Sequence, residues 1–84
     1  MSESKLFAQI QNGLLERFHL PLDVYEDVDQ EGQITQHFVV QASGMTIDQL
    51  LELEDLITDF HVGVLGEIKS LNKRVLIRAE AVAA

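Results

Sequence analysis

Apolar residues near the N-terminus recur at the three- and four-residue intervals typical of one side of an α-helix. The apolar line consists of Phe7, Ile10, Leu14 and Phe18. We expect an amphipathic helix over residues 4–18, capped by the Ser4 side chain. Gly13 indicates either a locally weak helix or the close approach of another element. Pro21 prevents the helix from continuing.

Residues 22–28 and 33–42 are rich in valine, isoleucine and phenylalanine, which favour extended strands. In the second segment, mostly apolar residues alternate along one face. Between the two segments, residues 29–32 begin with an acid and end with a glycine, as tight turns often do. The pattern therefore predicts a β-hairpin.

A second helix is predicted to begin at Ile47, because Thr46 and Gln49 have the spacing of a capping box. We expect it to run to Phe60. Its apolar side chains cover more than half of its circumference, which is wider than a helix lying on one sheet face requires. They are Ile47, Leu50, Leu51, Leu53, Leu56, Ile57 and Phe60.

The C-terminal segment resembles a second hairpin. Val62, Val64 and Ile68 fall on alternate positions, while Gly63 and Gly66 disfavour a longer helix. A turn at residues 70–73 and a strand over residues 74–82 would complete the hairpin. We therefore expect one compact α+β domain over residues 1–84, ordered helix-strand-strand-helix-strand-strand. Its four-stranded, mainly antiparallel sheet would carry both helices on one face.

Four carboxylates form a stripe along the second helix. Asp48, Glu52, Asp55 and Asp59 recur at i, i+4, i+7 and i+11, so they share one narrow line. No lysine or arginine lies four residues after any of them. The stripe should therefore remain in water or contact a basic partner.

The net charge of −8 is unevenly distributed, because residues 1–60 contain twelve acids and only two bases. This acidity argues against direct nucleic-acid binding, which depends on clustered lysine and arginine. A protein with a basic surface is the more natural partner, although the charge also suits a role in solubility alone. There are no cysteines, no basic and apolar leader, and no membrane-length apolar run. We expect a soluble cytoplasmic protein that does not bind membranes.

Sequence patterns for metal binding and nucleophilic catalysis are weak. Residues 27–38 resemble part of an EF-hand calcium loop, but Phe38 occupies the position that needs a bidentate glutamate. His19, His37 and His61 lack the spacing of a helical metal site, and His37 should face solvent. We expect no metal and no cofactor.

Glu54 stands out because it falls on the apolar side of the second helix. It could lie at the rim, with its carboxylate extended into solvent or paired with Arg74 or Arg78, or it could belong to an interface. A third alternative is a catalytic acid whose pKa is raised by burial.

The preferred hypothesis is a small, non-enzymatic protein-interaction or regulatory domain. A homodimer would account for the surplus apolar surface of the second helix and the apolar last strand. A monomer whose two helices pack on each other as well as on the sheet is the alternative. An acidic inhibitor or nucleic-acid mimic, of the kind mobile elements encode, is a second version of the hypothesis. The candidate partner-binding residues are Asp48, Glu52, Glu54, Asp55 and Asp59. The alternative is a small-ligand-binding or enzymatic domain with a pocket between sheet and helices.

Overall fold

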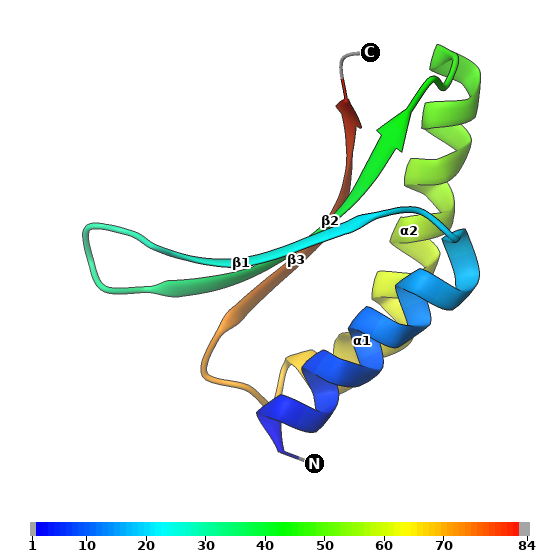
Figure 1. Cartoon of the computed structure of the whole chain (residues 1–84). Helices are drawn as coiled ribbons and strands as arrows, with labels where there is room; N and C mark the ends of the chain where they lie inside the picture. Colours follow the sequence, from blue (N-terminus) through cyan, green and yellow to red (C-terminus); the bar gives the residue numbers. More distant parts are fainter. Residues whose placement is uncertain (1, 83–84) are drawn as a thin grey trace.

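The computed structural model describes residues 2–82 and contains two helices and three strands (Figure 1). The elements in chain order are α1 (Glu3–Phe18), β1 (Leu22–Val28), β2 (Ile34–Ser43), α2 (Ile47–Ile68) and β3 (Arg74–Val82).

Helix α1 begins one residue earlier than the sequence predicts, so Ser4 is not its cap. The side chain of Ser2 accepts a hydrogen bond from the Lys5 backbone N–H at 3.3 Å and is the N-cap. At the other end, His19 adopts a left-handed conformation (φ 54°), and its N–H donates to the Leu15 carbonyl at 3.0 Å. This cap turns the chain toward β1.

Strands β1 and β2 form the expected antiparallel hairpin, with Leu22 opposite Val40 and Val28 opposite Ile34. The Asp29 carboxylate accepts backbone hydrogen bonds from Glu31 and Gln33 at 2.9 and 2.8 Å. It therefore stabilises the turn itself, which accounts for the acid that resembled a calcium ligand.

The tip of the hairpin projects away from both helices (Figure 1). The radius of gyration is 13.2 Å, whereas a compact domain of this length is expected to have a value of about 12 Å. The projecting hairpin accounts for the difference.

Helix α2 begins at Ile47, as predicted, but it does not end at the predicted residue. The Thr46 side chain accepts from the Gln49 N–H, and the Gln49 side chain accepts from the Thr46 N–H, which completes the capping box. The helix then continues to Ile68 instead of stopping at Phe60. Residues 62–68, expected to form a strand, are its last two turns.

The sheet has three strands and is mixed, so the predicted four-stranded, mainly antiparallel sheet is wrong. Strand order is β1-β2-β3, with β2 and β3 parallel and Phe38 opposite Ile77. Parallel neighbours require a crossover, and α2 supplies it. The residues assigned to a fourth strand are those that complete this crossover helix.

Both helices pack on the same face of the sheet (Figure 1). The core residues of the strands lie at alternate positions, even-numbered in β2 and odd-numbered in β3. Phe38 is fully buried at the centre, and its ring meets Phe7 edge-to-face at a centroid separation of 5.7 Å. The buried core comprises Leu6, Ile10, Leu14, Phe38, Val40, Ala42, Leu53, Ile57, Ile68, Val75 and Ile77.

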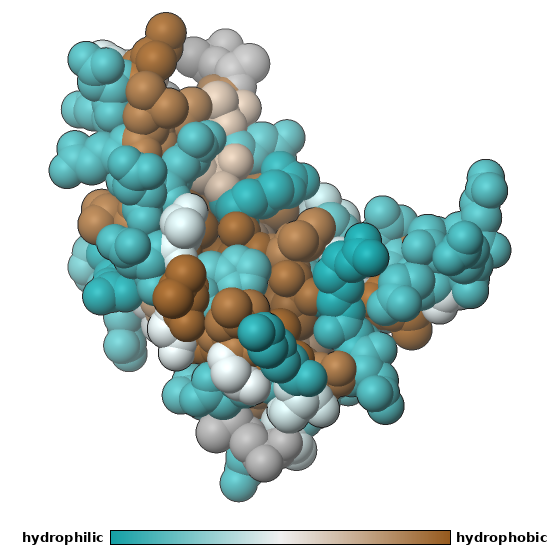
Figure 2. Space-filling view, turned by 180° about the vertical axis from the view of Figure 1, so that it is seen from behind, coloured by the Kyte–Doolittle hydropathy of each residue, from teal (hydrophilic) through white to brown (hydrophobic). Residues whose placement is uncertain are grey.

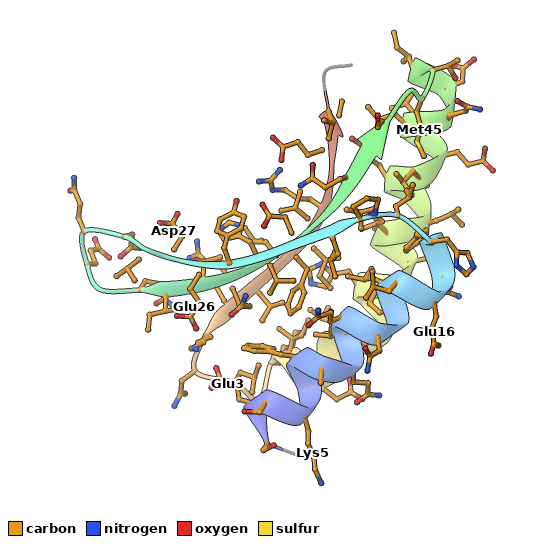
Figure 3. All side chains as sticks on the ribbon, viewed as in Figure 1. Glu3, Lys5, Glu16, Glu26, Asp27 and Met45 are labelled. Atoms are coloured by element: carbon orange, nitrogen blue, oxygen red, sulfur yellow. The ribbon has the colours of Figure 1, made fainter. Side chains whose placement is uncertain are left out.

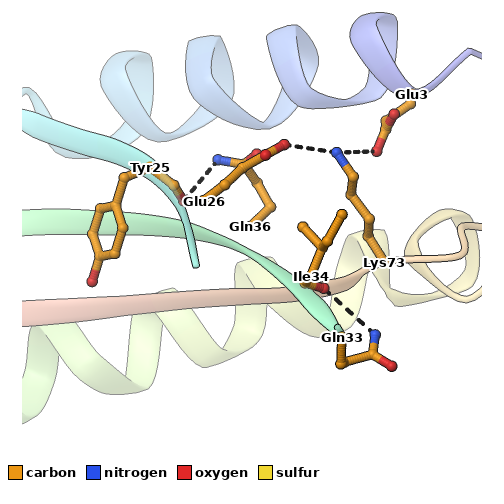
Figure 4. A network of polar contacts seen from close by, with 7 residues as sticks. All are labelled: Glu3, Tyr25, Glu26, Gln33, Ile34, Gln36 and Lys73. Atoms are coloured by element: carbon orange, nitrogen blue, oxygen red, sulfur yellow. Dashed lines mark hydrogen bonds and ion pairs between the residues drawn. The ribbon is translucent and has the colours of Figure 1, made fainter. Parts of the chain in front are cut away.

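Lys73 joins three parts of the fold (Figure 4). Its Nζ lies 2.7 Å from a Glu26 carboxylate oxygen of β1 and 2.9 Å from one of Glu3 in α1. The hydrogen bonds to Glu26, which has the larger effect, and to Glu3 raise the pKa of Lys73. Nearby, the buried Gln36 side chain donates to the Tyr25 carbonyl at 3.1 Å, which satisfies a polar group beneath the hairpin.

Candidate protein-interaction surface

Strand β3 has a strand neighbour on one edge only. Its other edge has no strand partner within residues 2–82. Such an edge presents backbone donors and acceptors that can pair with another strand. The opposite edge strand, β1, carries Asp23, Glu26 and Asp27 (Figure 3), and their charges discourage pairing there. β3 is the more open of the two edges.

A shallow pocket marks where α2 lies beside the free edge of β3. Its volume is about 220 Å³, and its lining is Glu54, Ile57, Thr58, Ile77, Arg78 and Ala79. Three consecutive strand residues contribute, although neighbours in a strand point to opposite faces. The pocket therefore opens at the strand edge.

The side of α2 next to this edge is largely apolar and exposed. We define the α2 flank as Ile47, Leu51, Glu54, Thr58, Val62, Leu65 and Lys69, which follow one another at helical spacing. Three of its apolar side chains are more than half exposed: Ile47 at 78%, Leu51 at 55% and Val62 at 64%. Figure 2 shows an apolar ridge over the part of α2 where the helix begins.

The opposite side of α2 faces α1. There the Phe60 ring lies against Gly13, and the Arg17 guanidinium carbon is 5.9 Å from the ring centroid. A Cβ added at Gly13 would approach the Phe60 ring to 2.9 Å. Gly13 therefore permits a close helix–helix contact, which was one of its two interpretations from the sequence. This contact uses apolar surface of α2, but it leaves the α2 flank uncovered.

The acidic stripe occupies a third side of α2, turned away from the sheet. All four of its carboxylates, Asp48, Glu52, Asp55 and Asp59, are exposed. None forms an ion pair with another residue in the described part of the chain. Asp48 also lies in the first helical turn, where the helix dipole favours a negative charge.

Glu54 does not belong to the stripe. It is exposed, which agrees with a position at the rim and not with the buried catalytic acid that was the third alternative. It lines the pocket together with Arg78, whose guanidinium instead lies 4.0 Å from Glu80 and 3.1 Å from the Tyr25 hydroxyl. The structure therefore separates the candidate residues into a four-member stripe and a glutamate at the β3 edge.

The sheet face without helices is partly covered by its own side chains. Tyr25 and His37 stack with ring centroids 4.6 Å apart, and Arg78 donates to the Tyr25 hydroxyl across β2. Val39 is fully buried on this face. His37 is half-buried, not solvent-exposed as expected, and its Nδ1 has no hydrogen-bond partner within residues 2–82. This covering makes the sheet face a weaker docking surface than the β3 edge.

The three histidines remain on separate elements, since His19 caps α1, His37 lies in β2 and His61 lies in α2. Within residues 2–82, no group of histidine and acidic side chains is arranged to hold a metal ion. A wider depression of about 480 Å³ includes Lys69, Lys73 and Arg74 near the C-terminal end of α2. These cations lie at the opposite end of α2 from Asp48.

The sequence matches no family model, and neither a curated protein nor a solved structure is significantly similar to it. No helix within residues 2–82 combines the length and the apolar character needed to cross a bilayer.

Proposed function

We propose that this chain is a non-enzymatic protein-interaction domain that binds its partner through the free edge of β3 and the adjoining α2 flank. The observation that carries the proposal is the exposure of Ile47, Leu51 and Val62 beside an unpaired strand edge. Ile47 and Leu51 are neighbours one helical turn apart, and exposed apolar surface of this kind is typical of protein-binding sites. An open strand edge adds a directional means of recognition through main-chain hydrogen bonds.

The pocket at this edge favours protein binding over small-molecule chemistry. Its volume of about 220 Å³ is below the roughly 300–1,000 Å³ of typical ligand sites. Glu54 is exposed there. The enzymatic alternative thus loses the buried carboxylate on which it depended.

Photo-crosslinking from single positions tests the proposal in cells that naturally make the protein. A photoreactive amino acid at Leu51 should crosslink to protein, whereas the same group at Gln11, exposed on α1, should not. Crosslinking of equal yield from both positions, or from neither, would contradict the proposal. Circular dichroism of both variants verifies that each retains the fold.

The acidic stripe supports a second version of the function, in which α2 binds a basic protein surface as an inhibitor or nucleic-acid mimic. Its four carboxylates are exposed, aligned and without ion pairs in residues 2–82. Replacing Glu52 and Asp55 by lysine should abolish capture of a basic partner and leave the fold intact. Unchanged capture by the doubly substituted protein would exclude this version.

A further inference from the structure

We infer that the occupant of the β3 edge and α2 flank is a second copy of this chain, related by a twofold axis. The two β3 strands would pair antiparallel, joining two three-stranded sheets into one of six strands. The two α2 helices would then lie side by side on the same face of the joined sheet. The inference rests on the proposed function, because it specifies the partner of the same surface.

The charges along β3 restrict how two copies can pair. Directly opposed residues of an antiparallel pair point to the same face of the sheet, and residues on one face of β3 are separated by an even number of positions. The twofold axis between two β3 strands must therefore lie level with a residue and not midway between two residues. An axis at Leu76 would place Arg74 opposite Arg78 of the second copy, and an axis at Arg78 would place that arginine opposite itself. Both arrangements oppose like charges. An axis at Ile77 instead places Arg74 opposite Glu80 of the second copy, twice.

The α2 flank independently selects the same axis. When two copies pack antiparallel with Thr58 at the twofold axis, Leu51 lies opposite Leu65 of the second copy. Ile47 then lies opposite Lys69 of the second copy, close to Asp48, so opposite charges approach at both ends of the contact. Glu54 lies opposite Val62 of the second copy in the same register. The seam therefore combines the Leu51–Leu65 contacts, a small residue at the axis, complementary ends and a glutamate beside each Val62.

The positions of Ile77 and Thr58 allow the strand axis and the helix axis to be a single twofold axis. Ile77 and Thr58 line the same pocket at the edge of β3, so one twofold axis can pass near both. An axis at Ala79 would also oppose arginine to glutamate, through Arg78 and Glu80. However, it would move the helix axis about four residues along α2 and place Glu54 near its own copy. Like-charge repulsion between the glutamates disfavours that alternative.

The solution mass, measured by light scattering over a dilution series, tests for the dimer with the full chain. We expect twice the 9.4 kDa chain mass at high concentration. Arg74→Glu alone and Glu80→Arg alone should each weaken association by about tenfold, since both oppositely charged pairs become like-charged. The double variant, Arg74→Glu with Glu80→Arg, should restore it. Arg74 has no ion pair within the described residues of its own chain, so the single change there spares the monomer fold.

A cysteine crosslink tests the helix seam separately, and the absence of native cysteines makes single positions unambiguous. Thr58→Cys should form a disulfide-linked dimer under mild oxidation, while Gln11→Cys on α1 should remain monomeric under denaturing electrophoresis. A dimer that Thr58→Cys fails to link would overturn the proposed arrangement. The arrangement would also be overturned if dimerisation were restored by the charge exchange Arg78→Glu with Glu80→Arg and not by Arg74→Glu with Glu80→Arg.

The inference of a second copy and the proposed function can be tested separately. A strictly monomeric protein at millimolar concentration overturns the inference of a second copy. The proposed function would then still be judged by crosslinking from Leu51, which reports any protein partner. A crosslink from Leu51 only to other proteins would support the general proposal and contradict self-association. A crosslink to the chain itself, together with the rescued charge exchange, supports both.

Discussion

The contact between Gly13 of α1 and Phe60 of α2 predicts that Gly13→Ala destabilises the wild-type fold but stabilises a variant in which Phe60 is replaced by a smaller residue. Gly13 lies inside α1, where alanine is better than glycine by about 1 kcal/mol in the absence of other effects. In this protein, the added methyl group would lie 2.9 Å from Cε2 and 3.0 Å from Cζ of Phe60. One of the two helices must therefore move, or the ring must rotate.

The magnitude follows from two opposing terms. Overpacking of this kind costs typically about 1–3 kcal/mol, against a gain in helix propensity of about 1 kcal/mol. We expect Gly13→Ala to lower the free energy of unfolding by about 1 kcal/mol. Phe60→Leu removes the two ring atoms that the methyl group would meet. In that background, Gly13→Ala should raise the free energy of unfolding by about 1 kcal/mol.

Urea unfolding of the wild type, both single variants and the double variant measures this coupling as a double-mutant cycle. All four proteins should be compared at one concentration, because self-association would add to the apparent stability. Gly13→Ala with the same effect in both backgrounds would refute the reasoning. The contact would then not limit the approach of α1 to α2.

Two further predictions concern the core and the Lys73 ion pairs. Phe38→Ala should lower the free energy of unfolding by about 3–5 kcal/mol in urea titrations, because Phe38 is fully buried and packs against Phe7; a loss below about 1 kcal/mol would contradict its central position. Lys73→Met should destabilise the fold at neutral pH, because it removes the contacts to Glu26 and Glu3. The folded state raises the pKa of Lys73, so its stabilising contribution is complete below the unfolded pKa of about 10.4. Thermal unfolding of wild type and variant should therefore converge as pH rises through the higher pKa of the folded state, and a constant difference would exclude the proposed linkage.

Local signals in the sequence predicted most of the elements. The capping box at Thr46 and the β-forming residues of 74–82 lead to structure at the expected positions. The predicted end of α2 was wrong, because Gly63 and Gly66 were given more weight than the helical spacing of the apolar residues after Phe60. Each glycine disfavours a helix by about 1 kcal/mol relative to alanine. Val64 and Ile68 continue the buried line of α2, and their burial in the core offsets that cost.

The length of α2 also follows from the topology, which local patterns did not reveal. A parallel connection must return along the length of the strand that it precedes. The nine residues of β3 span about 30 Å, and the 22 residues of α2 span about 33 Å. A helix ending at Phe60 would span only about 21 Å and would require a second long element to complete the return.

The unusual width of the apolar surface on α2 has three structural causes. One part faces the sheet through Leu53 and Ile57, and a second faces α1 through Phe60. The third is the exposed flank beside β3. Its register becomes visible only when the helix extends to Ile68, because Leu65 lies beyond the predicted end. The same error in helix length therefore obscured both the parallel sheet and the direction of the candidate interface.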